Sequence, residues 1–333
     1  MKKRYYILVS FVILGFIGWY FGSTTHSHLK GTDAEKLTAF MDQKASDIGF
    51  NGTVLVAKEG EVLFSKGYGY ADKENEIANT PDTVFHIASL SKSFTALSIL
   101  QLEELGKLQT EDPISNYFED FPNGDRITVH HLLNHSSGIP ELLSLVENGK
   151  EHTLEELYVA IKTAELEFEP GSKYSYSNSG YFLLALIIEK LSELSLADYI
   201  QEHIIEPAEM KHTYFVAAPV PQAIGYENME EPTHLIDISI AYGAGNMLSI
   251  TGDLLLFDKA INEGKLLSKK NVDKMQTGNI NAAPFGIVQY GYGWSISESW
   301  YSFNHKAVAH VGGFTGFKNF LLRFLRMKLR LLF

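Results

Sequence analysis

The sequence predicts an α/β fold of the α+β type, in which an antiparallel sheet flanked by helices is interrupted by a large all-helical insertion. Short alternating runs typical of strands occur near both ends of the 333-residue chain, whereas the pattern from Pro81 to about Glu206 is helical. We therefore assign about 33–80 and 245–323 to the sheet part and about 81–244 to the helical part. A cleft is expected where the two parts meet.

Composition excludes some classes of function. The formal charge is −12, from 28 basic and 40 acidic residues, whereas a surface that binds nucleic acid needs clustered Lys and Arg. The chain has no cysteine, which removes both a disulfide framework and a thiolate metal site. No nucleic-acid partner is therefore expected.

The N-terminus predicts attachment to a membrane. Basic residues at 2–4 precede the uncharged, mostly apolar stretch 5–21, which ends in the aromatic residues 19–21. This length is close to that of a bilayer span, and aromatic rings suit its edge. We interpret 1–22 as an uncleaved single-pass anchor and 23–32 as a linker, with the domain 33–333 outside the cytoplasmic membrane. A cleaved secretory signal is the alternative.

The sheet part begins with a helix from Asp33 to about Gly49, where apolar residues recur at helical spacing. Two alternating runs follow, and Glu59-Gly60 between them is typical of a hairpin turn. Strand-like sequence returns near the other end of the chain, in 290–300, 306–313 and 316–322.

The helical part contains one segment that is apolar nearly all round. It runs from Ser91 to Leu105 and is apolar as far as Leu100, so this helix should be buried. Other segments with a helical pattern are Val129 to Asn134, Leu154 to Ala164, Ser179 to Leu194 and Thr251 to Ile261.

Ser89 and Lys92 lie three residues apart where the apolar helix begins. As structure alone, Ser89 is a helix N-cap. Lys92 would then put a cation against the positive end of the helix dipole, at a position that favours Glu or Gln. Burial and the dipole could instead keep this lysine neutral, so that it accepts the serine proton, while free N–H groups at the helix start stabilise an oxyanion. The S-x-x-K spacing is typical of serine acyl-transfer enzymes.

A second element is Tyr176-Ser177-Asn178, which follows a Pro-Gly turn and precedes a predicted helix. As structure alone, Asn178 caps that helix. In a serine acyl-transfer site the phenol of Tyr176 could relay a proton, and the amide of Asn178 could hold a substrate carbonyl.

A third element places His310 on a predicted strand, followed by Gly312 and Gly313. Glycine inside a strand usually marks a bulge or the close approach of another backbone. We expect the approaching backbone to be that of the substrate.

These three elements, in this order and spacing, resemble the family of class C β-lactamases, penicillin-binding DD-peptidases and related esterases. The similarity covers roughly residues 35–323. It extends to the segments DTVFHIASLSKSFTA, ITVHHLLNHSSGIPEL, FEPGSKYSYSNSGY, GAGNMLSITGDLLLF and YGYGWSI. The resemblance implies a β-lactamase/transpeptidase-like fold without a cofactor.

The resemblance also implies roles for individual residues. Ser89 would be the acylated nucleophile and Lys92 its hydrogen-bonded base. Tyr176 would exchange protons with Lys92 and the leaving group, and Asn178 would bind the substrate amide.

On the third element, His310 would support the proton network or an anionic substrate group. The main-chain N–H groups of Ser89 and Gly313 would form the oxyanion hole, with Gly312 beside them on the substrate-binding strand. Where the β-lactamases of the family usually have Lys-Thr-Gly, this sequence has His310-Val311-Gly312. Val311 lacks a hydroxyl and His310 is largely neutral at pH 7, which favours a peptidase or an esterase over an efficient β-lactamase.

His130, His131 and His135 invite a comparison with metal sites, because the last two are one helical turn apart. No carboxylate or further ligand is evident nearby, and the resemblance treats this segment as scaffold. No metal site is predicted.

The end of the sequence is basic, with no acidic residue after Glu298. In the resembled family the strand after the third element is followed by at least one more strand and a C-terminal helix, for which this sequence leaves no room. We expect a frameshift or a truncated gene near residue 323, which would expose one sheet face and an unpaired strand edge next to His310. A basic amphipathic tail on an anionic membrane surface is the alternative.

The sequence therefore predicts a membrane-anchored, extracytoplasmic serine hydrolase that forms an acyl-enzyme at Ser89. Its substrate would be a small molecule or peptide, such as a peptidoglycan-derived peptide, an ester or an amide. The alternatives are a non-catalytic protein that binds penicillin or muropeptides, and an inactive truncated product.

Overall fold

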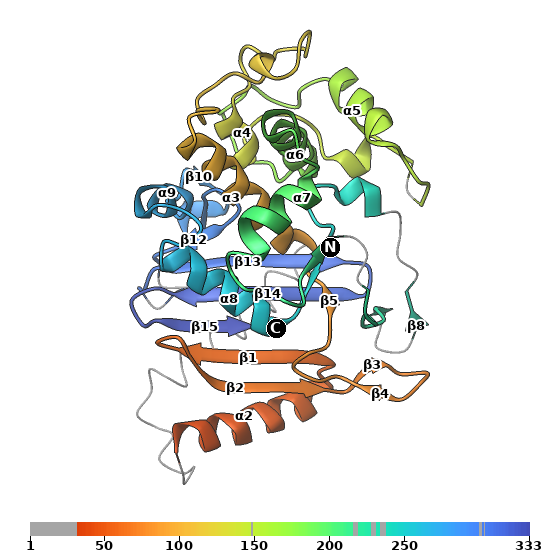
Figure 1. Cartoon of the computed structure of the whole chain (residues 1–333), viewed down its shortest axis with the longest axis vertical. Coiled ribbons are helices and arrows are strands. Elements are labelled where there is room, and N and C mark those ends of the chain that lie inside the picture. The colour runs from red at the N-terminus through yellow and green to blue at the C-terminus, as the bar shows by residue number, and fades with distance from the viewer. Residues whose placement is uncertain are drawn as a thin grey trace.

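Eight antiparallel strands form the main sheet of the computed structural model, which describes residues 32–147, 149–215, 219–227, 231–233, 238–299, 302 and 304–333. From one edge to the other the strands are β10 (Ile280–Asn281), β11 (Gln289–Tyr290), β12 (Ser295–Ser297), β13 (Ala307–Phe314), β14 (Phe317–Phe324), β15 (Leu329–Leu332), β1 (Gly52–Lys58) and β2 (Glu61–Tyr68). Figure 1 shows this sheet in the lower half of the view, with most of the helices above it. The predicted fold class is confirmed.

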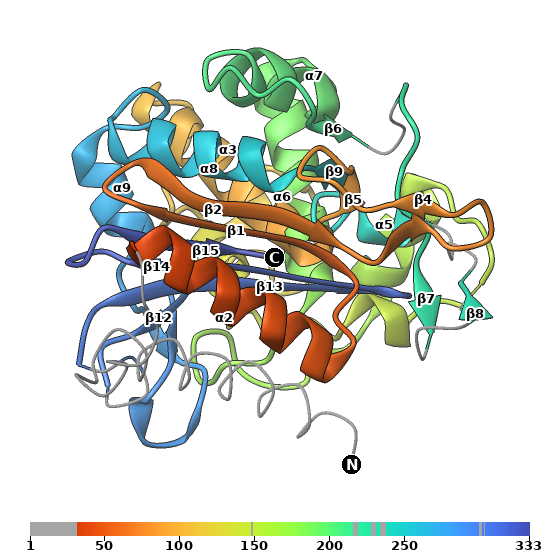
Figure 2. The same ribbon diagram turned by 90° about the horizontal axis from the view of Figure 1, so that it is seen from below.

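Helices lie on both faces of the sheet. Figure 2 shows α2 (Asp33–Ile48) on one face, with α3 (Ser91–Glu104) and α8 (Thr251–Asn262) on the other. The predicted first helix is thus confirmed. It begins in a capping box between Thr32 and Glu35 and ends at Gly49, whose φ of 62° is left-handed. An apolar cluster includes Leu37 of this helix and sheet residues Val54, Val56, Phe64, Phe320, Leu322, Phe324 and Leu331.

The predicted hairpin turn at Glu59-Gly60 is also confirmed. Strands β1 and β2 pair antiparallel, with Lys58 opposite Glu61. Glu59 and Gly60 both have positive φ, of 55° and 88°, as a two-residue type I′ hairpin turn requires.

The helical part packs its largest apolar cluster against the sheet. In α3 every residue from Ser91 to Leu100 is buried, as its apolar sequence predicts. The other helices are α4 (Val129–Leu133), α5 (Leu154–Thr163), α6 (Asn178–Ser192), α7 (Leu196–Ile200) and α9 (Lys269–Met275). The predicted helical segments match α4, α5, α6 and α8 to within two residues at each end.

Short strands connect the two parts. β5 (Phe85–His86) and β6 (Tyr214–Phe215) pair with opposite edges of β9 (Met247–Ser249), so the chain just before Ser89 is fixed to a segment far away in sequence. Two small pairs lie apart from this, namely β3 (Tyr70–Asp72) with β4 (Ile77–Ala78) and β7 (Tyr226–Glu227) with β8 (Glu231–Pro232).

The prediction that the sequence leaves no room for a further strand after 316–322 was wrong. The strand β14 runs through Arg323, and β15 follows it and pairs with β14 and β1. Because β14 is paired with β13 and β15, the expected unpaired edge on that side of His310 is not present.

Buried charge explains why a strand can continue through the arginine. Arg323 is fully buried and its Nη1 donates to Asp258 Oδ1 of α8 at 2.9 Å. The guanidinium carbon of Arg323 also lies 4.2 Å from the ring centre of Trp294, and Arg330 of β15 binds the other oxygen of Asp258. Two basic residues of the final stretch are therefore part of the sheet's packing.

The predicted anchor, 1–22, and the linker as far as residue 31 lie outside the described residues. Among the helices that the structure describes, none is long and apolar enough to cross a membrane.

Candidate active site

Ser89 lies in a single 3₁₀ turn, Ala88–Leu90, directly before α3. The N-cap of α3 is Leu90 and makes no side-chain capping bond, so Ser89 is not the helix cap that the simplest interpretation predicts. The preceding Ala88 has a φ of 47°, which is uncommon for a residue other than glycine. A side chain held on a strained turn is typical of functional sites.

Lys92 is fully buried one turn along and connects three elements. Its Nζ lies 3.3 Å from Ser89 Oγ, and it donates to Asn178 Oδ1 at 2.6 Å and to the Ala244 carbonyl at 2.8 Å. Burial lowers the pKa of Lys92 to about 7, although the charge of Glu141 acts in the opposite direction. A substantial fraction of the amine is therefore neutral near neutral pH, with a lone pair available to Ser89.

Tyr176 lies beside the lysine. Its ring centre is 4.8 Å from Lys92 Nζ, and its side chain is 37% exposed. Desolvation raises the pKa of Tyr176 well above its ordinary value, although an interaction of the hydroxyl with Ser89 lowers it. The phenol stays protonated at neutral pH and can therefore donate a proton to a leaving group.

Asn178 is the first residue of α6, and its side chain does not cap that helix. Its Oδ1 accepts from Lys92 Nζ, and its Nδ2 donates to Glu141 Oε1 at 2.6 Å. Both ends of the amide are thus engaged within the protein. Asn178 would have to exchange one of these contacts to bind a substrate amide, so that role stays a prediction.

Glu141 is the site residue that the sequence analysis missed. Besides its contact with Asn178 Nδ2, its Oε2 accepts from the Asn178 main-chain N–H at 2.7 Å. It is the single acidic residue between Asp125 and Glu147, and it directly follows Pro140. An isolated carboxylate in a stretch of small and apolar residues was the signal that could have identified it.

His310 faces the helical part from β13, and both of its ring nitrogens have hydrogen-bond partners within the protein. Nδ1 lies 2.9 Å from the Val311 carbonyl, so it carries the hydrogen, and Nε2 accepts from the hydroxyl of Tyr290 at 2.8 Å. Burial, and then the charge of Lys92, lower the pKa of His310 to about 3. A neutral ring with both nitrogens engaged offers no cation to an anionic substrate group, so the proton network is the role that this geometry favours.

The two glycines of β13 differ in their surroundings. A β-carbon on Gly312 would lie 2.2 Å from the Ile87 carbonyl, whereas one on Gly313 would meet nothing within 4 Å. The backbone approaching Gly312 is therefore that of the chain itself, which corrects the expectation that it is the substrate's. Gly312 lets β13 lie against the turn that carries Ser89, and Gly313 remains a prediction for the oxyanion hole.

The edge of β13 is open beside this turn. The strand pairs with β14 over its whole length, but its pairing with β12 ends at Ala309. No described strand pairs with that edge from His310 to Phe314. An extended substrate could therefore align with β13 while its carbonyl reaches Ser89.

The three histidines that invited a comparison with metal sites have separate partners. His130 Nδ1 lies 2.7 Å from the Tyr292 hydroxyl, His131 Nδ1 accepts from the Thr128 main-chain N–H, and His135 packs against Tyr176. Within the described ranges, no three His, Asp or Glu side chains are grouped so that they could hold a metal ion.

The chain is similar to known proteins over most of its length. A family model described as Beta-lactamase matches residues 37–322. The putative penicillin-binding protein PbpX of Bacillus subtilis (strain 168) is 38% identical over 287 residues, which cover 83% of this chain and 70% of that protein. Penicillin-binding protein 4* of the same strain is 33% identical over 301 residues, which cover 83% of this chain and 66% of its own length.

Two solved structures have the same fold. An octameric penicillin-binding protein homologue from Pyrococcus abyssi has a TM-score of 0.77 and 32% identity, and the match covers 90% of this chain and 73% of that one. A D-amino acid amidase from Ochrobactrum anthropi SV3, complexed with L-phenylalanine, has a TM-score of 0.78 and 26% identity, with 90% of each chain covered.

Proposed function

Because the chain belongs to the beta-lactamase family of penicillin-binding proteins and amidases, we propose that it is a serine hydrolase that forms an acyl-enzyme at Ser89. The observation that carries the proposal is the placing of Lys92 Nζ, buried and 3.3 Å from Ser89 Oγ, with its pKa lowered to about 7. A neutral amine at this distance is a base for the serine hydroxyl.

The contacts of Lys92 support a defined first step. In its neutral form the amine donates its two hydrogens to Asn178 Oδ1 and the Ala244 carbonyl, which leaves its lone pair for Ser89. Ser89 Oγ then bonds to the substrate carbonyl carbon as its proton passes to Lys92. The bond to the leaving amine or alcohol breaks as that group takes a proton from Tyr176, which regains one from Lys92. Water then hydrolyses the acyl ester.

The substrate that we propose is a cell-wall peptide, an ester or an amide. Relatives named as penicillin-binding proteins and a D-amino acid amidase support this range. The neutral ring of His310 supports a peptide, ester or amide over a β-lactam whose carboxylate needs a cation. We also propose that residues 1–22 anchor the protein with its domain outside the cytoplasmic membrane, on the charge and apolar pattern of that segment.

Labelling of the detergent-solubilised full chain with fluorescent penicillin, and turnover of a panel of esters and D-amino acid amides, tests the proposal. Ser89→Ala should abolish both signals. Ser98→Ala is the matched control, because it removes a buried hydroxyl from α3, the helix that follows the turn of Ser89, and in the described contacts that hydroxyl donates to the Phe94 carbonyl. Equal turnover in Ser89→Ala and the unmodified protein would refute Ser89 as nucleophile. Labelling without turnover would favour a non-catalytic binding protein.

A further inference from the structure

His135 accepts hydrogen bonds from the backbone on both sides of Tyr176. The main-chain N–H of Ser175 donates to the His135 carbonyl at 2.9 Å, and the main-chain N–H of Ser177 donates to the His135 ring at Nδ1, at 3.2 Å. Between these two bonds, the ring of His135 lies against the ring of Tyr176, with their centres 4.3 Å apart. One side chain and one carbonyl thus fix the residues before and after Tyr176 as well as its ring.

We propose that His135 is a positioning residue that holds the phenol of Tyr176 in its place beside Ser89 and Lys92. The inference rests on the proposed function and goes beyond it, because it assigns a role to a residue that does not touch Ser89 in the described contacts. It also explains a histidine that the sequence pattern alone linked only to metal sites.

The state of the ring fits this role. Because Nδ1 accepts a hydrogen bond from Ser177, the hydrogen of the neutral ring is on Nε2. Burial, followed by the charges of Lys92 and His310, keeps the pKa of His135 well below its ordinary value. The ring therefore stays uncharged, and Nδ1 keeps the lone pair that the Ser177 N–H needs.

The backbone at His135 also requires particular residue types. His135 is 2% exposed and has a φ of 62°, a left-handed conformation that Asn, Asp and His adopt more readily than other residues with side chains. A hydrogen-bonding network supports this turn: Ser136 Oγ donates to Asn134 Oδ1 at 2.6 Å, and Asn134 Nδ2 donates to His130 Nε2 at 3.0 Å.

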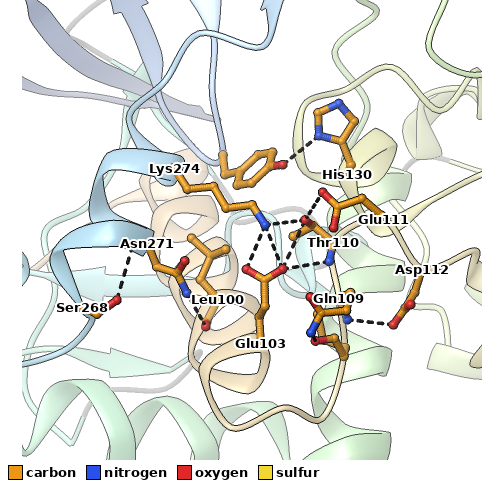
Figure 3. A network of polar contacts seen from close by, with 12 residues as sticks. Leu100, Glu103, Gln109, Thr110, Glu111, Asp112, His130, Ser268, Asn271 and Lys274 are labelled. Atoms are coloured by element: carbon orange, nitrogen blue, oxygen red, sulfur yellow. Dashed lines mark hydrogen bonds and ion pairs between the residues drawn. The ribbon is translucent and has the colours of Figure 1, made fainter.

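The network continues to the helix that carries Lys92. His130 bonds to the hydroxyl of Tyr292, and Figure 3 shows His130 near the ion pair of Lys274 of α9 with Glu103 of α3. Gly293, which follows Tyr292 in the sequence, lies so close to α3 that a β-carbon on it would be 2.9 Å from the Lys92 carbonyl. The turn of His135 and the helix of Lys92 therefore share one support, which keeps Tyr176 in register with the lysine.

Two substitutions test the hydrogen-bond acceptor of His135 separately from its aromatic ring. His135→Asn keeps an acceptor near the place of Nδ1 and tolerates the left-handed backbone, whereas His135→Phe keeps a ring and loses the acceptor. A catalytic group displaced by about 1 Å loses on the order of 100-fold in rate. We expect the acylation rate constant to fall about 30- to 100-fold in His135→Phe, with the substrate saturation constant nearly unchanged, and about 5-fold or less in His135→Asn.

His203→Phe is the matched control, because His203 also stacks on a tyrosine, Tyr199, with ring centres 4.3 Å apart, near the other end of α3. It should acylate at the unmodified rate. Amide hydrogen exchange of Ser177 gives a readout that needs no activity: exchange should quicken in His135→Phe and stay slow in His135→Asn. The ring ¹⁵N shifts of His135 should report a hydrogen on Nε2.

Equal acylation and equal Ser177 exchange in His135→Phe and the unmodified protein would overturn the proposal, and so would His135→Asn as slow as His135→Phe. If His135→Phe does not fold, a hydrogen on Nδ1 in the unmodified protein would still refute it. If the unmodified protein does not acylate, the proposed function fails, and Ser177 exchange alone then decides whether His135 positions this loop.

Discussion

Glu141 binds Asn178 through both carboxylate oxygens, one at the main-chain N–H and one at the side-chain Nδ2. This double contact turns Asn178 Oδ1 towards Lys92 Nζ, 2.6 Å away. Glu141 therefore orients the base of the site through Asn178, and its charge also acts on the lysine, where it raises the pKa.

Replacing Glu141 by glutamine should impair acylation in two ways. A glutamine amide would turn its NH₂ towards one of the two donors of Asn178 and leave a half-buried donor unpaired, which costs about 1–3 kcal/mol. We expect the acylation rate of Glu141→Gln to fall about 10- to 100-fold. Because the negative charge is lost, the rise of the rate with pH should also move to lower pH.

Stopped-flow acylation from pH 5 to 9 measures both effects. Glu147→Gln is the control, since Glu147 is an exposed carboxylate a few residues further along. An unchanged rate and an unchanged pH profile in Glu141→Gln would show that the contact with Asn178 has no role in the reaction.

The acylation rate of the unmodified protein should depend on pH through Lys92. The lysine must be neutral to accept the proton of Ser89, and burial lowers its pKa to about 7. We therefore expect the rate to rise with pH up to about 7 and then to level off. A rate that keeps rising to pH 10 would mean that the lysine retains its ordinary pKa.

The same shift predicts a pH dependence of stability. Between about 7 and the ordinary value of 10.5, the unfolded chain binds a proton at Lys92 that the folded chain does not. The free energy of unfolding should therefore rise with pH in this window, by at most about 1.4 kcal/mol per pH unit. Urea unfolding of the unmodified protein and of Lys92→Met, compared at pH 7 and pH 9, isolates this contribution, because the other titrating groups cancel. The idea fails if the two proteins gain equally.

The sequence predicted those parts of the fold that depend on local patterning. The helix at Asp33 has a capping box and ends at a glycine with a left-handed backbone, and the run from Ser91 to Leu100, apolar nearly all round, is buried throughout. Both features depend on residues that are close together in the sequence. The SxxK spacing likewise brings Ser89 and Lys92 together on adjacent turns.

Contacts between distant residues could not be predicted in this way. Glu141 meets Asn178 across 37 positions, and Arg323 meets Asp258 across 65. From composition alone, the basic final stretch did not fit a chain that is acidic overall. No residue near Arg323 in the sequence indicates that the buried Asp258 is available to pair with it. The backbone that approaches Gly312 was predicted to be that of the substrate for the same reason, because Ile87 is far from Gly312 in the sequence.

Replacing Gly312 by alanine should disturb the nucleophile turn. The added methyl group would lie 2.2 Å from the Ile87 carbonyl, two residues before Ser89, so the strand or the turn must shift. We expect the acylation rate of Gly312→Ala to fall about 100-fold, since a displacement near 1 Å costs this much. Gly252→Ala in α8 is the control, because its methyl group would meet only the Ile250 side chain, at 3.6 Å. Wild-type acylation by Gly312→Ala would show that β13 does not constrain the turn.

The ion pairs of Asp258 allow a test of how far the final strand contributes to stability. Asp258 is 3% exposed and binds both Arg323 and Arg330, so Asp258→Asn would leave a fully buried guanidinium without its counter-charge. Breaking a buried pair in this way costs about 3–5 kcal/mol, whereas an exposed pair contributes about 1 kcal/mol or less. Asp273→Asn is the matched control, because Asp273 pairs with Lys269 in an exposed position of α9. Urea unfolding should therefore separate the two variants by several kcal/mol. Equal midpoints would mean that β15 and its arginine do not pack against α8 in solution, and the fixed position of β14 beside β13 would then need another cause.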